Sequence, residues 1–72
     1  EQHAIIEVAV PEDWQGRSIG ELDIRRKYGV NILGVKRNGN TDVNISPETV
    51  LDADMTLLVL GENQELKKHF RL

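Results

Sequence analysis

The chain contains no cysteine and only two histidines, and these absences exclude whole classes of site. Without cysteine there is neither a disulfide nor a thiolate metal site, and the composition fits a reducing compartment. The histidines, His3 and His69, lie near opposite ends of the chain, with no ligand spacing that suits zinc. We therefore expect no metal centre and no cofactor.

Aromatic residues and long apolar runs are also scarce. Trp14, Tyr28 and Phe70 are the only aromatics, too few for the stacking platforms on which RNA-binding domains hold bases. The longest apolar run covers residues 57–60, far below the length of about 20 residues that crosses a membrane. We expect neither a nucleic acid polymer as partner nor direct insertion into a membrane.

No catalytic constellation stands out either. Ser18 has the position of a helix cap, and Ser46 precedes a proline in a turn. A phosphate-binding loop of the Gly-x-Gly-x-x-Gly or Walker type is absent. Asp52 and Asp54 alternate at the entrance of a strand, where solvated turn acids are the ordinary case. We expect a protein that is not an enzyme.

The length of 72 residues allows one domain, covering residues 1–72. A domain this small buries only about 60% of the surface that its unfolded chain exposes. It usually needs a disulfide, a metal or a partner subunit, and here oligomerisation is the support that remains. Because residue 1 is glutamate rather than methionine, we interpret the chain as a fragment of a longer protein.

The net charge of −3 is unevenly distributed. Residues 17–37 hold six basic and two acidic residues, whereas the rest of the chain holds three basic and ten acidic ones. A local cationic segment on an acidic domain favours a compact anionic partner over a long nucleic acid, which usually meets a broad basic face. Ordinary mixing of charges on a solvated surface is the alternative that charge alone leaves open.

Hydrophobic patterning predicts an α+β fold of order β-α-β-β-β-α with a mainly antiparallel sheet. The expected strands cover residues 3–10, 31–37, 41–45 and a central 55–61; the expected helices cover residues 18–28 and begin again at about 63.

Alternation along the strands assigns their faces. We expect Leu33 and Val35 on one side of their strand and Gly34 on the other, with Val43 and Ile45 inward on the next strand.

The first helix has apolar residues on two sides. Ser18 is the expected N-cap, Ile19 and Leu22 share one face, and Ile24 and Tyr28 share a roughly opposite face. Such a helix is expected to contact its own sheet and a second body. The pattern leaves open whether that body is another subunit or a neighbouring loop of the same chain.

Three motifs resemble the C-terminal domain of the regulators of potassium conductance, the RCK_C or TrkA-C family. They are Gly-x-Ser-Ile-x-Glu-Leu-Asp-Ile-Arg at residues 16–25, Tyr-Gly-Val-Asn-Ile-Leu at 28–33 and Leu-Leu-Val-Leu-Gly at 57–61. The likeness covers nearly the whole chain. Ala53 stands where the family usually has glycine, with no functional consequence that we expect.

The resemblance implies a homodimer on the cytoplasmic side of a potassium (or related cation) channel or transporter, which it regulates as a ligand sensor. Residues 22–33 are most similar to the branch that binds cyclic di-AMP in a cleft between two subunits. Carried over by position, the implied ligand-binding residues are Ile19, Ile24, Arg25, Asn31, Ile32 and Pro47. To these we add Arg26, which stands where the branch often has a small residue and either adds a phosphate contact or crowds the cleft.

In such a cleft the resemblance assigns each residue a role. Arg25 would form paired hydrogen bonds to a phosphate, Asn31 would bond a phosphate or an adenine edge, and the isoleucines and Pro47 would wall the bases. The alternative functions are a structural dimerisation domain without a ligand of its own, or a sensor of another small ligand or cation. Arg25 would then pair only with Asp23, Glu21 or an acid of the partner.

Overall fold

A four-stranded antiparallel sheet is the framework of the domain in this computed structural model, which describes residues 2–70. Its strands are β1 (His3–Ala9), β2 (Val30–Arg37), β3 (Asn40–Asp42) and β4 (Thr56–Glu62), and they lie in the order β1-β4-β2-β3. Every neighbouring pair is antiparallel. The predicted α+β fold is confirmed, and the segment predicted as the central strand forms β4 between β1 and β2.

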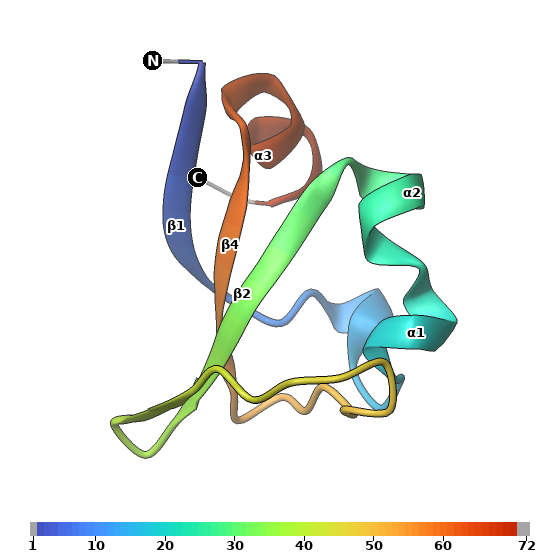
Figure 1. The fold of residues 1–72 in the computed structure, drawn as a ribbon, viewed down its shortest axis with the longest axis vertical. Helices are drawn as coiled ribbons and strands as arrows, with labels where there is room; N and C mark the ends of the chain where they lie inside the picture. The colour runs from blue at the N-terminus through green and yellow to red at the C-terminus, as the bar shows by residue number, and fades with distance from the viewer. Residues whose placement is uncertain (1, 71–72) are drawn as a thin grey trace.

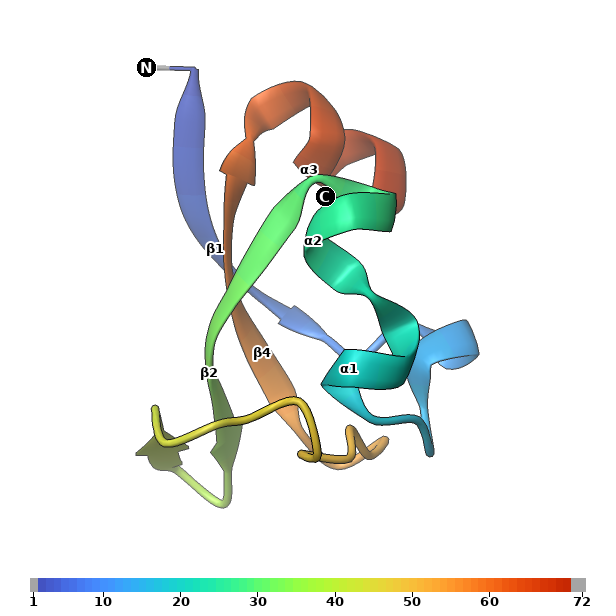
Figure 2. The same cartoon turned by 45° about the vertical axis from the view of Figure 1, so that its right-hand side comes forward.

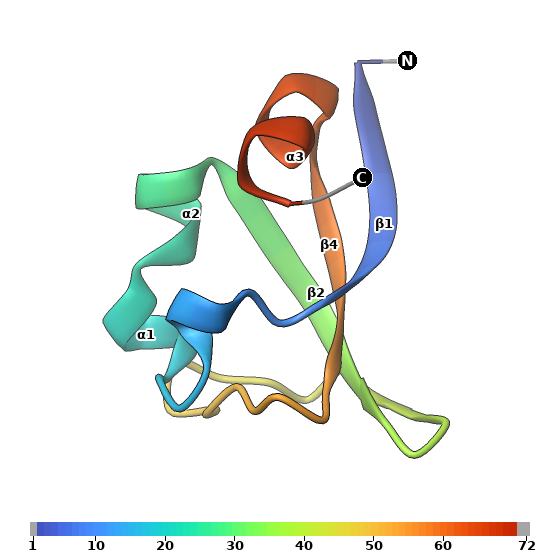
Figure 3. The same ribbon diagram turned by 180° about the vertical axis from the view of Figure 1, so that it is seen from behind.

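The helices are α1 (Ile19–Leu22), α2 (Ile24–Tyr28) and α3 (Asn63–His69), and a short 3-10 helix (Glu12–Trp14) lies between β1 and α1. They lie to one side of the sheet (Figures 1 and 2), and Figure 3 shows the same layering from behind. None of the helices described within residues 2–70 has the length and hydrophobicity of a membrane span.

The prediction of one continuous helix over residues 18–28 is wrong, because the backbone breaks at Asp23. This residue is left-handed, with φ 51° and ψ 50°. In a continuous helix Leu22 and Ile24 would point about 200° apart. The break re-aims the second segment, so that both side chains enter the same core and each is only 3% exposed.

Local signals set the outer ends of the helix pair. The Oγ of Ser18 accepts the N–H of Glu21 at 3.1 Å, which confirms the predicted cap. At the other end Gly29 adopts φ 70°, and its N–H donates to the carbonyl of Arg25 at 3.1 Å.

A bulge in β2 overturns the predicted strand faces. The register with β4 shifts between Ile32 and Gly34, so Leu33 is the extra residue. Leu33 is 38% exposed while Val35 is 7% exposed, and the two do not share an inner face.

The strand after the hairpin is also shorter than predicted. It ends at Asp42, and Val43, expected to point inward, is 68% exposed. Ile45 does pack against the core, but from a loop that leaves the hairpin, passes beneath α1 and returns to β4 (Figure 1).

The core lies between the sheet and the helices. From β4 it takes Leu57 and Val59, both 0% exposed, and from α3 it takes Leu66, which is 1% exposed. Trp14 closes the side of this core. Its ring centroid lies 4.9 Å from that of Tyr28 and 5.5 Å from that of Phe70.

Candidate ligand-binding site

The N-terminal end of α1 is covered by the loop that follows β3. The N–H of Ile19 donates to the carbonyl of Thr49 at 2.9 Å, and the N–H of Gly20 donates to the carbonyl of Pro47 at 2.8 Å. The third N–H of this turn, from Glu21, is held by Ser18. Because all three donors have partners within the chain, this helix end offers no backbone cradle for a phosphate.

The same contacts bring together two predicted site residues that are 28 positions apart in the sequence, Ile19 and Pro47. Ile19 is half-buried and Pro47 is exposed, so the pair presents an apolar surface beside α1. A flat apolar ligand group can pack against this surface on one face. A single chain leaves the other face of such a group uncovered.

Arg25 and Arg26 differ in their partners. The Nε of Arg26 lies 3.0 Å from a carboxylate oxygen of Asp23, and Glu21 pairs with Arg17 at 3.7 Å. Arg25 is exposed on α2 and has no ion pair or side-chain hydrogen bond with any residue of the described range 2–70. Its guanidinium is therefore available to an anion, and its predicted alternative partners are engaged elsewhere.

Asn31 lies in a groove of about 710 Å³ between the end of α2, the start of β2 and α3. Arg26, Lys27 and Lys68 also line this groove, together with the two acidic residues Glu62 and Glu65. The sequence patterns do not point to Lys68, since nothing in the sequence links the last helix to the cationic segment around residue 25.

Ile24 is the least accessible of the predicted wall residues, since it is 3% exposed within the core. Ile32, like Ile19, is half-buried and packs against the core, so each leaves part of its side chain open to a ligand. Tyr28 likewise rests on Trp14 of the same chain, so the second contact of this helical segment is intramolecular. Contacts of Ile24 and Ile32 with a ligand stay predictions.

The other concave and acidic regions are less suited to an anion. A hollow of about 660 Å³ near the end of α3 is lined by Glu7, Glu12 and Asp13.

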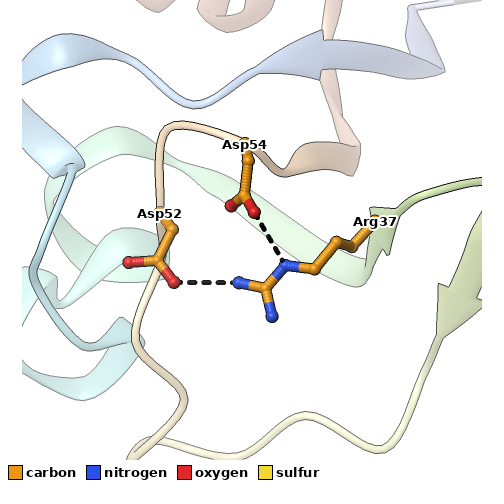
Figure 4. Close-up of polar contacts among 3 residues, drawn as sticks. All are labelled: Arg37, Asp52 and Asp54. Carbon is orange, nitrogen blue, oxygen red and sulfur yellow. Dashed lines mark hydrogen bonds and ion pairs between the residues drawn. The ribbon is translucent and has the colours of Figure 1, made fainter.

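Asp52 and Asp54 are exposed turn acids, as predicted, but they share one partner. The guanidinium of Arg37 lies 2.8 Å from Asp52 and 3.3 Å from Asp54 (Figure 4). Among residues 2–70 no three acidic or histidine side chains gather in a way that could hold a metal ion.

The model of the TrkA-C domain matches residues 4–72. The chain belongs to the TrkA-C domain family. The TrkA-C domain is a regulatory module without catalytic activity, and the expectation of a non-enzymatic domain is confirmed by this membership.

Two curated relatives and one solved structure resemble this TrkA-C domain over most of its length. "Ktr system potassium uptake protein A" and "Ktr system potassium uptake protein C" of Bacillus subtilis are 26% and 29% identical, each over 94% of this chain and 31% of the relative. The RCK C domain of the potassium transport protein KtrA, solved in complex with cyclic diadenosine monophosphate, is 33% identical over 93% of this chain and 79% of that chain, with a TM-score of 0.82.

A further solved structure shares the fold. The RCK_C domain dimer of S. agalactiae BusR, in complex with c-di-AMP, has a TM-score of 0.77 at 23% identity and covers 100% of this chain and 95% of that chain. A longer BusR chain has been solved with promoter DNA, and this domain covers 36% of it at 24% identity. Likeness at this level shows the fold alone, so the absence of a nucleic acid partner stays a prediction. The TrkA-C domain spans about a third of the length of the Ktr relatives.

Proposed function

We propose that the chain is the cytoplasmic ligand-sensing domain, residues 1–72, of a longer regulator of potassium (or related cation) transport. The proposed ligand is cyclic di-AMP, bound between two copies of the chain. The observation that carries the proposal is the 33% identity, over 93% of this chain, with the KtrA domain that was solved with that ligand.

The chemistry of the surface supports an anionic, flat ligand. Arg25 is exposed on α2 and its guanidinium pairs with no residue of the described range 2–70, and a guanidinium can form two parallel hydrogen bonds with a phosphate. The apolar pair Ile19 and Pro47 offers a face for an adenine. Asn31 lines the groove between the end of α2, the start of β2 and α3, where its amide can bond a remaining polar atom of the ligand.

A second copy of the chain is the proposed partner that completes the site. Leu33, Val43 and Val50 are exposed to 38%, 68% and 45%, so apolar surface remains uncovered in the single chain. Cyclic di-AMP is two-fold symmetric and can meet the same patch twice across a two-fold axis. Binding of the ligand to both subunits then stabilises the dimer by mass action. A ligand that binds one dimer geometry more tightly also shifts the attached transporter toward the state that this geometry favours.

Calorimetry with cyclic di-AMP tests the proposal, with Arg25→Ala and Arg26→Ala as matched variants. Both remove one positive charge, so long-range attraction falls equally in the two. We expect Arg25→Ala to weaken binding by at least about tenfold, because a charge-assisted hydrogen bond is lost in each subunit. For Arg26→Ala, whose side chain is 85% exposed and paired with Asp23, we expect less than about a threefold change.

Two results would contradict the proposal. Absence of binding heat with the unmodified chain rules out cyclic di-AMP as its ligand. Equal losses in the two variants mean that the anion is attracted by general charge rather than held by Arg25. Sedimentation with and without the ligand checks the dimer, which is expected to gain population when the ligand is present.

A further inference from the structure

The placement of Pro47 depends on a close backbone contact rather than on side-chain packing. Its carbonyl accepts the N–H of Gly20 at 2.8 Å, and two residues on, the carbonyl of Thr49 accepts the N–H of Ile19. Further along, Leu51 exchanges backbone hydrogen bonds with residues 16 and 17, and Ser18 and Val50 form an isolated bridge. The loop is therefore held along the edge of α1, with Pro47 opposite Gly20.

Gly20 has little room for a side chain in this arrangement. A Cβ built there lies 3.0 Å from the Cβ of Pro47 and 3.0 Å from its carbonyl oxygen. That oxygen is the one that the N–H of Gly20 binds, so an alanine relieves the contact only by lengthening this hydrogen bond. The nearby atoms belong to a backbone and a rigid ring, and the loop itself must shift.

Neither backbone conformation nor helix formation explains a glycine at this position. Gly20 lies in α1 and is not among the residues with positive φ. Helix propensity favours alanine over glycine. Gly20 is also exposed, so a methyl group would not enter the core. The contact with Pro47 is the remaining reason for glycine.

We propose that Gly20 is a positioning residue for the ligand, because it fixes how far Pro47 stands from Ile19 and hence the width of the adenine-binding face. The inference rests on the proposed function. A displacement of a few tenths of an ångström is enough to lower affinity, since dispersion contacts fall steeply over a gap of 0.5–1 Å. The two-fold axis repeats the loss in the second subunit.

The experiment is a double-mutant cycle on cyclic di-AMP affinity with Gly20→Ala, Pro47→Ala and the double variant, measured by calorimetry on the whole chain. We expect Pro47→Ala to weaken binding by about fivefold and Gly20→Ala by about threefold to fivefold, because displacing the Pro47 ring cannot cost more than removing it. In the double variant we expect no loss beyond that of Pro47→Ala, because the ring that Gly20 positions is already absent.

Structural readouts separate positioning from loss of the fold. Circular dichroism of Gly20→Ala is expected to match that of the unmodified chain, while the amide of residue 20 exchanges its hydrogen faster as its bond to Pro47 lengthens. Gly20→Ser, whose Cβ meets the same atoms, is expected to reproduce both results.

The outcomes distinguish the two proposals. If the unmodified chain binds and Gly20→Ala binds within twofold, or if the two losses multiply, the positioning role is overturned and the proposed function stands. If both Gly20 variants unfold, Gly20 is structural and the positioning role is likewise overturned. If the unmodified chain does not bind, the proposed function fails, and the positioning role fails with it.

Discussion

Gly61 in β4 provides the sharpest test of the core packing. A Cβ built at this glycine lies 2.7 Å from Cγ1 of Val30 and 3.3 Å from Cδ2 of Leu66. Carbon atoms pack at about 3.5–4.0 Å, so a methyl group overlaps Val30 by about 1 Å. Val30 is 0% exposed and Leu66 is 1% exposed, and neither can turn outward without opening the core. Gly61→Ala is therefore expected to overpack the centre of the domain.

The expected loss is about 1–3 kcal/mol in the free energy of unfolding, the usual range for an added methylene in a filled core. A domain of 72 residues has a total stability of about 4–11 kcal/mol, so the variant stays mostly folded. Val30→Ala removes the overlapping methyl groups and alone costs about 1.5–3 kcal/mol. In the double variant each change relieves the other, and the loss is expected to fall short of the sum by about 1–2 kcal/mol.

Urea unfolding followed by tryptophan fluorescence measures these values. Trp14 is the only tryptophan and is 2% exposed, so its emission reports on opening of the core. The concentration of the chain must be the same for every variant, because a dimer gains apparent stability with concentration. A Gly61→Ala loss below about 0.5 kcal/mol, or strictly additive losses, would show that Val30 and Leu66 can move aside and that the core is not overpacked by a methyl group at residue 61.

Two further predictions concern the backbone break and the surface clamp. Asp23→Val is expected to lower the free energy of unfolding by about 1–2 kcal/mol, since a β-branched residue tolerates φ 51° poorly. The control Asp23→Asn is expected to change it by less than about 1 kcal/mol, because asparagine tolerates this conformation. Equal losses of the two variants in urea unfolding would contradict a role of the left-handed conformation. Arg37→Ala removes the ion pairs with Asp52 and Asp54. Because these side chains are about half exposed, the free energy of unfolding is expected to fall by about 1 kcal/mol or less, and the loss shrinks in 1 M salt. A larger loss that does not depend on salt would contradict this estimate.

The candidate site was only partly accessible to sequence reasoning. The resemblance pointed to Ile19 and Pro47, but their adjacency follows from backbone hydrogen bonds that no local pattern encodes. Arg25 lacks an intrachain ion pair with Asp23 or Glu21 because these two acids pair with Arg26 and Arg17, and the sequence does not specify which arginine each acid pairs with. Lys68 reaches the groove of Asn31 because α3 packs beside the start of β2, which is a long-range contact.

The order of the strands and helical segments, the cap at Ser18 and the central position of β4 could be predicted from the sequence alone. These depend on local hydrogen bonds and on hydrophobic periodicity, which neighbouring residues specify. Long-range packing set the break at Asp23 and the bulge at Leu33, and it left residue 43 outside the sheet. At Asp23 and at Leu33 the burial of neighbouring core residues outweighed the local preference, because a left-handed residue or an interrupted ladder costs less than leaving a core side chain in water.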